Sequence, residues 1–291
     1  MRKLPKKRVS PYEKYHIILE EKDHKFVAFS KKHNCMLLGL VAPIFLPSAA
    51  ADMPDSIAIS REETMGMTHI VDSVEKEFGL PRTLYFLIET IGGSGAAAYN
   101  MARLLRSKFK KIVVFVPHFA LSAGTVLACM SDEIVMDVTS HLGPFDAYLE
   151  IPDLGLVSGS ALRKGIEIAE EYYRGRGDKD PEKRVRDRVD PAIQGLLEDA
   201  QKAGELYLTE VLTLAKYSKR KVKSIVKKLV WDYPTHEYPI TIEEAKELGL
   251  RVSPRSKYPE LWGLMEEWLD KLAFHPKNAD HLIAFAHPGM A

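Results

Sequence analysis

The sequence has few cysteines, no excess of charge of one sign and no apolar run long enough to span a bilayer. Its two cysteines, Cys35 and Cys129, lie in apolar stretches without metal-ligand spacing, so we expect neither a disulfide framework nor a metal site. This cysteine usage fits a reducing, cytoplasmic compartment. Lys and Arg number 41 against 40 Asp and Glu, so the net charge of +1 gives no overall attraction to nucleic acid or membrane.

Residues 35–51 form an apolar segment that resembles a signal peptide, because Lys31 and Lys32 precede it and three alanines end it. However, 34 residues come before it, and Pro43 and Pro47 interrupt a run that is too short to cross a bilayer. We therefore expect a buried strand or an apolar hairpin here. Peripheral membrane insertion, and with it membrane association of a cytoplasmic protein, is the alternative.

The chain does have enough apolar residues, 46% of 291, for one large domain or one with an appended helical arm. Apolar strands at 83–88 and 111–116 each run through a turn into a helix. Strands are also expected across 15–60, and a helix over 68–78. This alternation of strands and helices predicts an α/β fold with a parallel sheet.

Ser122 follows the second of these strands and opens an apolar helix within residues 120–125. A serine at a helix start can cap the helix, its hydroxyl accepting a backbone N–H. It can also be a nucleophile, because the unpaired N–H groups of a helix N-terminus favour an oxyanion. This motif alone leaves both interpretations open.

The glycine-rich turn at 92–95, after the first strand, favours the catalytic interpretation. The carboxyl ends of neighbouring parallel strands share one sheet edge, so this turn and Ser122 should meet. The N–H groups of Gly92, Gly93 and Ala123 would then donate to a tetrahedral intermediate at Ser122. One alternative is a dinucleotide-binding loop, although the next strand ends without the acidic residue that would hold a ribose hydroxyl. The other is that the glycines only allow close packing.

The chain divides into four segments. Residues 1–14 form a basic tail, and 15–158 form the α/β core that carries Ser122. Residues 159–232 form a helical arm, and 233–291 return to the core and end in a C-terminal helix. Glycines, a proline and alternating charges predict an exposed, mobile linker inside the arm, at 174–188.

Seven basic residues lie within 216–228, among apolar residues at helical spacing. This pattern predicts a solvated face over a buried stripe. An anionic membrane surface or nucleic acid is the alternative, but no aromatic platform or zinc ligand accompanies the charge, so we expect no nucleic-acid partner. Further on, Thr241 and Glu244 form a capping box that starts a helix, and Gly249 ends it before a strand.

The motifs described above, taken in their order along the chain, resemble those of the Clp protease/crotonase superfamily. Within it they resemble the serine peptidases related to signal peptide peptidase A, and most of all the serine dehydrogenase proteinases. The resemblance covers 56–252; its strongest parts are 113–125, 132–137, 142–146 and the tail at 236–250. It implies a crotonase/Clp-protease-like fold of stacked ββα units.

By this resemblance Ser122 is the nucleophile, and Gly92, Gly93 and the N–H of Ala123 form the oxyanion hole. Two positions depart from the family pattern. Ile91 stands where the family usually has proline, and Ala123 stands where close relatives often have glycine. Neither change removes a backbone donor.

The resemblance leaves the general base open. Signal peptide peptidases use a serine–lysine dyad, which makes Lys164, 42 residues after Ser122, the first candidate. The Clp protease uses Ser-His-Asp, with its histidine in the segment that corresponds to 142–146, where this chain has none. Further candidates for the base or an orienting group are His118, His141, His236 and Glu237.

The sequence therefore predicts an ATP-independent serine endopeptidase that hydrolyses peptides or membrane-associated protein segments through an acyl-enzyme at Ser122, with no cofactor. A homo-oligomer is implied by the resemblance alone. One alternative is a crotonase-like acyl-CoA hydrolase or lyase, although no adenine site is evident. The other is a catalytically silent scaffold that binds peptides.

Overall fold

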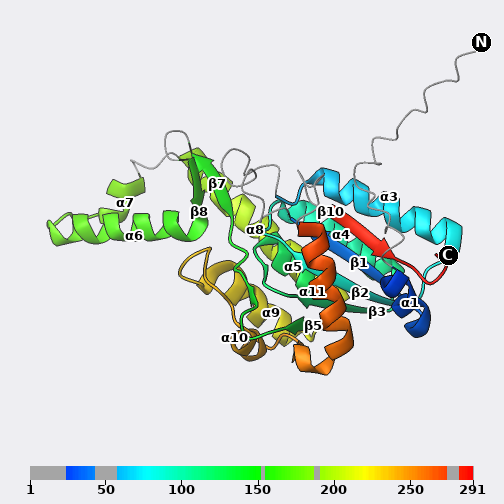
Figure 1. Cartoon of the computed structure of the whole chain (residues 1–291). Helices are drawn as coiled ribbons and strands as arrows, with labels where there is room; N and C mark the ends of the chain where they lie inside the picture. Colours follow the sequence, from blue (N-terminus) through cyan, green and yellow to red (C-terminus); the bar gives the residue numbers. More distant parts are fainter. Residues whose placement is uncertain (1–23, 43–57, 152–154, 187–190, 274–281, 291) are drawn as a thin grey trace, which may run out of the picture.

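The fold is built on a six-stranded sheet (Figure 1). The computed structural model describes residues 24–42, 58–151, 155–186, 191–273 and 282–290. The strands follow one another across the sheet in the order β10 (Leu282–Ala286), β1 (Cys35–Val41), β2 (Thr83–Glu89), β3 (Lys111–Val116), β5 (Glu133–Met136) and β9 (Val252–Pro254). All neighbours pair in parallel except β10, which is antiparallel to β1. The predicted α/β fold with a mainly parallel sheet is confirmed.

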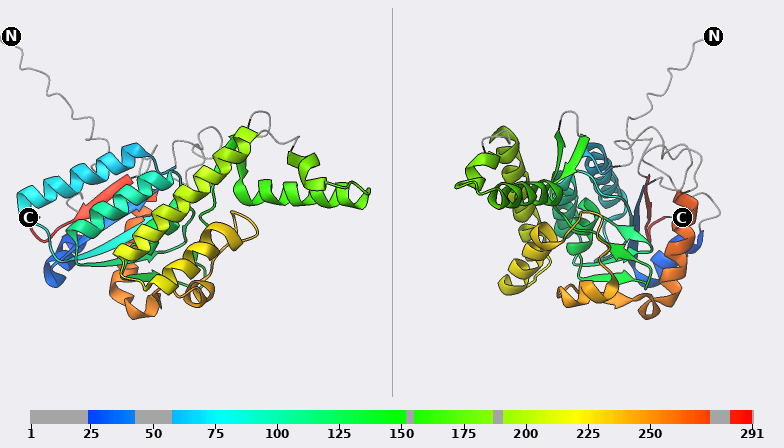
Figure 2. Two further views of the ribbon diagram at one scale, coloured as in Figure 1. Left: turned by 180° about the vertical axis from the view of Figure 1, so that it is seen from behind. Right: turned by 90° about the vertical axis from the view of Figure 1, so that its left-hand side faces the viewer.

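Helices cover both faces of the sheet, which is why its strands are apolar without alternation. One face packs against α3 (Arg61–Phe78), α4 (Gly95–Lys108), α5 (Ala123–Cys129) and α8 (Pro191–Leu214), and the other against α1 (His24–His33) and α11 (Pro259–Ala273). Figure 2 shows α3, α4 and α8 across the sheet when it is seen from behind. Successive residues of β1 alternate between the two faces, with Leu38 in one core cluster and Leu37 in the other.

The apolar segment at 35–51 begins as β1, a central strand whose seven residues are all buried. The prediction of a buried strand is confirmed for 35–41, and residues 43–57 lie outside the described part. Burial raises the pKa of both thiols, Cys35 and Cys129, to about 12, as expected for small core residues. Among the described residues, no helix is both long enough and apolar enough to cross a membrane.

The predictions for the N-terminal region were wrong in two places. Residues 24–33 form helix α1, where strands were expected, because Phe26, Val27 and Phe29 bury one helical face. Helix α3 starts at Arg61, not at 68, because Ser60 and Glu63 form a capping box at its N-terminus.

The arm begins with the hairpin of β7 (Tyr148–Ile151) and β8 (Gly155–Ser158) and continues as α6 (Gly159–Gly175), which extends away from the sheet (Figure 1). The expected linker at 174–188 is not a continuous loop. Helix α7 (Pro181–Arg186) lies inside it, because the Asp180 carboxylate accepts the N–H of Lys183 as a cap and Pro181 suits a first helical turn.

After the arm, the chain packs against the core again. Helix α9 (Lys219–Lys227) buries the stripe of Val222, Ile225 and Val226 and leaves its lysines and arginine exposed. Thr241 and Glu244 cap α10 (Ile242–Glu247), which leads into β9. The sequence analysis expected the chain to end in a helix; α11 is present, but the edge strand β10 follows it.

Candidate active site

Two loops at the carboxyl ends of β2 and β3 meet, as the parallel topology required. The backbone N–H of Leu121 donates to Thr90 O at 3.0 Å, and that of Thr90 donates to Phe119 O at 3.2 Å. These bonds place the glycine turn after β2 against the start of α5. Ser122 lies at this junction, between the short strand β4 (Phe119–Ala120) and α5.

Ser122 has a strained backbone, with φ of 48° and ψ of −114°. Because Gly124 N–H donates to Leu121 O at 2.7 Å, Ser122 occupies the first central position of a turn close to type II′, where glycine is the usual residue. Its side chain makes no cap hydrogen bond, so the capping interpretation is wrong. Strain of this kind persists where the surrounding structure holds it, often at functional sites.

Gly92 lies so close to this turn, and Gly93 so close to the backbone of Ile59, that neither position has room for a side chain. A Cβ on Gly92 would lie 2.7 Å from Ser122 Cβ, and a Cβ on Gly93 would lie 2.3 Å from the nitrogen of Ile59. The N–H of Gly92 donates to Thr90 Oγ1 at 3.1 Å. The N–H groups of Gly93 and Ala123 have no hydrogen-bond partner among the described residues. Of the three donors that the sequence suggested, Gly93 and Ala123 are the ones left for a ligand.

Gly92→Ala is expected to destabilise the fold more than Gly79→Ala. Both substitutions strain the backbone φ, but only the one at Gly92 also causes a steric overlap. Both Gly92 (φ 104°) and Gly79 (φ 74°) have backbones that alanine rarely adopts, but a Cβ on Gly79 meets nothing within 4 Å. Gly79→Ala should therefore lower the free energy of unfolding by about 1–2 kcal/mol, and Gly92→Ala by about 2 kcal/mol more, from overlap with Ser122. Urea unfolding of the two variants measures the difference. Equal losses would contradict the close approach of this loop to Ser122.

Ser122 is 9% exposed and opens onto a pocket of about 300 Å³. Asp146 and Tyr148 line this pocket too, together with Tyr207 of α8. The hydroxyl of Ser122 makes no hydrogen bond to any residue that the structure describes. It therefore faces a cavity in which a ligand atom can reach it.

A buried carboxylate at this pocket pairs with a histidine. Asp146 is 7% exposed; its Oδ1 is hydrogen-bonded to His236 Nδ1, and its Oδ2 accepts the N–H of Ser160 at 3.1 Å. Burial acts to raise the pKa of Asp146, but the hydrogen bond and the charge of His236, with the Ser160 N–H, outweigh it and lower the pKa. The ring of Tyr148 meets that of His236 edge-on, with centroids 4.3 Å apart.

The other candidate bases lie elsewhere. Lys164 is 67% exposed on α6 and pairs with Glu167 at 3.2 Å, so the structure does not bring the first candidate to Ser122. His118 lies 3.5 Å from the buried Glu89, whose hydrogen bond raises the pKa of His118 despite partial burial. His141 packs its ring against Phe119, and Glu237 is exposed. None of these four predicted residues is among the described residues that line the pocket at Ser122. His236 does not line it either, but it is hydrogen-bonded to Asp146, which does.

Sequence reasoning missed two parts of the site. Asp146 was noted only within a family-like segment, and nothing local links it to His236, 90 residues later. Thr125 was not singled out, yet its hydroxyl bonds to the carbonyl oxygens of Ala120 (2.8 Å) and Gly143 (2.7 Å), which fixes the turn that holds Ser122. No cluster of three or more His, Cys, Asp or Glu side chains suited to a metal ion occurs in the described ranges.

Two known proteins are similar to this chain in sequence. Two uncharacterized proteins of Methanocaldococcus jannaschii are 35% and 33% identical over 182 and 175 residues, which is 62% and 59% of this chain and 56% and 53% of theirs. The chain thus spans little more than half the length of these curated relatives.

Two solved structures are similar to this chain at low sequence identity. A serine-to-alanine mutant of the 1510-N membrane-bound stomatin-specific protease matches with a TM-score of 0.44 and 17% identity, over 70% of this chain and 78% of that one. An enoyl-CoA hydratase, described as putative, from Streptomyces coelicolor matches with a TM-score of 0.41 and 12% identity, over 81% and 70%.

The family match is the most extensive at the level of sequence. Residues 80–279, which include Ser122, Asp146 and His236, match the profile of the ClpP-like SDH-type serine proteinases. This match confirms the resemblance seen in the strand, turn and helix segments around Ser122. The chain belongs to the family of ClpP-like SDH-type serine proteinases.

Proposed function

We propose that this chain hydrolyses peptide bonds through an acyl-enzyme at Ser122. The observation that carries the proposal is the strained, uncapped Ser122 beside the N–H groups of Gly93 and Ala123, which are unpartnered within the described part of the chain. Such donors, fixed before the reaction, stabilise the oxyanion of a tetrahedral intermediate. A peptidase role also agrees with the serine proteinase family to which the chain belongs.

In the proposed reaction, Ser122 Oγ attacks the scissile carbonyl carbon and its proton passes to His236. The C–O bond forms as the carbonyl π pair moves to the oxygen, which the two N–H groups receive. His236 then gives the proton to the leaving amine as the C–N bond breaks, and water completes the cycle by the same route. We assign the base to His236 because Asp146, its partner, lines the same pocket as Ser122.

Asp146 acts as the orienting group in this proposal. Its carboxylate holds Nδ1 of His236, so the other ring nitrogen is the one that exchanges the proton of Ser122. The low pKa of Asp146 means that it stays a carboxylate at neutral pH and stabilises the imidazolium that forms.

A fluorophosphonate probe tests the nucleophile directly. We expect the native chain to be labelled once, with the added mass on the peptide that contains Ser122. Ser122→Ala should lose the label completely, and denatured wild-type protein, which has lost the oxyanion site, should not be labelled. An unlabelled native protein would support a catalytically silent scaffold, and a label that survives in Ser122→Ala would place the nucleophile elsewhere.

A further inference from the structure

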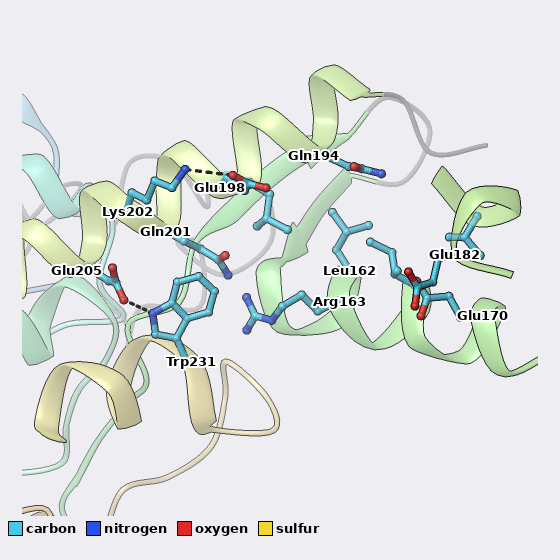
Figure 3. A pocket seen from close by; sticks show the side chains of 13 residues that line it. Leu162, Arg163, Glu170, Glu182, Gln194, Glu198, Gln201, Lys202, Glu205 and Trp231 are labelled. Carbon is cyan, nitrogen blue, oxygen red and sulfur yellow. Dashed lines mark hydrogen bonds and ion pairs between the residues drawn. The ribbon is translucent and has the colours of Figure 1, made fainter. Parts of the chain in front are cut away.

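A second pocket, of about 570 Å³, lies in the arm, between α6, α7, α8 and the π-helical segment η4 (Lys228–Asp232) (Figure 3). Ser122 is not among the residues that line it. Its walls are largely apolar, and a volume of this size suits a small organic ligand or a short peptide. The apolar wall consists of Leu162, Ile166, Val185, Leu197 and Trp231.

One end of this arm pocket presents hydrogen-bond donors without acceptors. Gln201 is 2% exposed, and its Nε2 has no hydrogen-bond partner among the described residues. The same is true of the Nη1 atom of Arg163. The Arg163 guanidinium lies over the ring of Trp231, 5.2 Å from its centroid, and Figure 3 shows it pointing toward that ring and Gln201. Buried donors left unpaired are unfavourable, so this end favours a ligand that brings acceptor oxygens.

The acidic residues nearest this end are already engaged. Glu205 accepts the indole N–H of Trp231, and Glu198 pairs with Lys202 at 3.0 Å (Figure 3). Neither carboxylate forms an ion pair with Arg163. A planar guanidinium with an adjacent amide N–H₂ matches the two oxygens of a carboxylate.

The other end of the arm pocket is acidic. Glu170 and Glu182 project into it from α6 and α7 (Figure 3), and neither pairs with a basic side chain in the part of the chain that the structure describes. Arg163 and Glu170 are seven residues apart on α6, so they share a face and lie about 10 Å apart along the helix axis. The two ends thus carry opposite charge.

We propose that this pocket binds a free peptide of about three residues with apolar side chains. Its carboxylate would lie at Arg163 and Gln201, and its ammonium group at Glu170 and Glu182. The positions of Arg163 and Glu170 on α6 are about 10 Å apart along the helix axis. An extended chain spans about 3.3–3.6 Å per residue, so about three residues cover that distance. The apolar walls receive the side chains. The proposal concerns binding and does not rest on catalysis at Ser122.

Calorimetric titration of the full chain with the tripeptide Leu-Ala-Leu tests the two charged ends. We expect measurable binding, weakened at least 10-fold when the N-terminus is acetylated and at least 10-fold when the C-terminus is amidated, because each change removes one charge-assisted interaction. Decanoate, which offers a carboxylate and an apolar tail only, should bind at least 10-fold more weakly than the free tripeptide. Absence of binding at millimolar peptide, or equal affinity for the free and blocked peptides, would overturn the proposal.

Variants assign each end to its residues. In Arg163→Met the free acid and the amide should bind within about 3-fold of each other, and in Gln201→Leu the preference for the free acid should fall. In Glu170→Gln, the affinities of the free peptide and the acetylated peptide should likewise come within about 3-fold of each other. Lys164→Met is the matched control, because Lys164 adjoins Arg163 on α6 but does not line the pocket. This variant should bind the tripeptide with the affinity of wild type. An unchanged preference for the free acid in both Arg163→Met and Gln201→Leu would overturn the assignment. Ser122→Ala should bind like wild type, which separates this result from the peptidase proposal.

Discussion

Replacing Ser122 with glycine is expected to abolish peptidase activity and, at the same time, to stabilise the fold relative to Ser122→Ala. Both variants lose the nucleophile, and kcat/KM should fall by about 10⁴- to 10⁶-fold. They differ in the backbone, because φ of 48° with ψ of −114° is favourable for glycine and strained for alanine. Relief of this strain is worth about 1–3 kcal/mol, and the greater freedom of glycine in the unfolded chain offsets about 0.4–1 kcal/mol of it.

Urea unfolding and peptide turnover, measured on the same preparations, check this prediction. Ser122→Gly should have a free energy of unfolding about 1 kcal/mol above that of Ser122→Ala, which itself should stay close to wild type. If Ser122→Gly is less stable than Ser122→Ala, the turn does not impose strain at this residue. If either variant keeps substantial turnover, Ser122 is not the nucleophile.

The strain at Ser122 persists because the surrounding hydrogen bonds fix both sides of the turn. The N–H of Leu121 is held by Thr90 O on one side, and the hydroxyl of Thr125 spans Ala120 O and Gly143 O on the other. Helix α5, which follows the turn, is fixed by its packing, since all its residues from Ala123 to Cys129 are buried. A rigid support of this kind is what keeps a strained residue in place on a tight turn.

The sequence predicted the central fold well because the signals there are local. Continuous apolar runs at 83–88 and 111–116 indicated strands covered on both faces, and the parallel order then required their loops to meet at one edge. The helix at 24–33 and the edge strand β10 were missed. Both are short, and their conformation depends on partners distant in sequence, since β10 pairs with β1 across about 245 residues.

The candidate site also has parts that local sequence predicted and parts that depend on residues distant in the chain. Ser122 and the glycine turn follow from two adjacent strand ends, so the sequence brought them together correctly. The pairing of Asp146 with His236 depends on how the tail folds back over the core, and no local pattern encodes it. Lys164 was selected by resemblance to the serine–lysine dyad of signal peptide peptidases, but its side chain on α6 is exposed.

Replacing His236 with glutamine is expected to lower kcat/KM for peptide hydrolysis by about 10²- to 10⁴-fold, the usual contribution of a general base. Glutamine can still donate a hydrogen bond to Asp146, so the buried carboxylate keeps a partner and the fold should be retained. Lys164→Met, which removes an exposed amine paired with Glu167, should stay within about 2-fold of wild type. Initial rates on a fluorogenic peptide, with urea unfolding as a check on stability, measure both.

Added imidazole distinguishes a proton carrier from a residue that only supports the pocket. In His236→Ala, a space opens beside Asp146 and Tyr148, and free imidazole should restore at least 10-fold of the lost rate with a dependence on pH that follows neutral imidazole. A merely structural histidine would give no such rescue. If His236→Gln retains its rate while Lys164→Met loses 100-fold, the base is the lysine, and α6 must then move toward Ser122 in the active form.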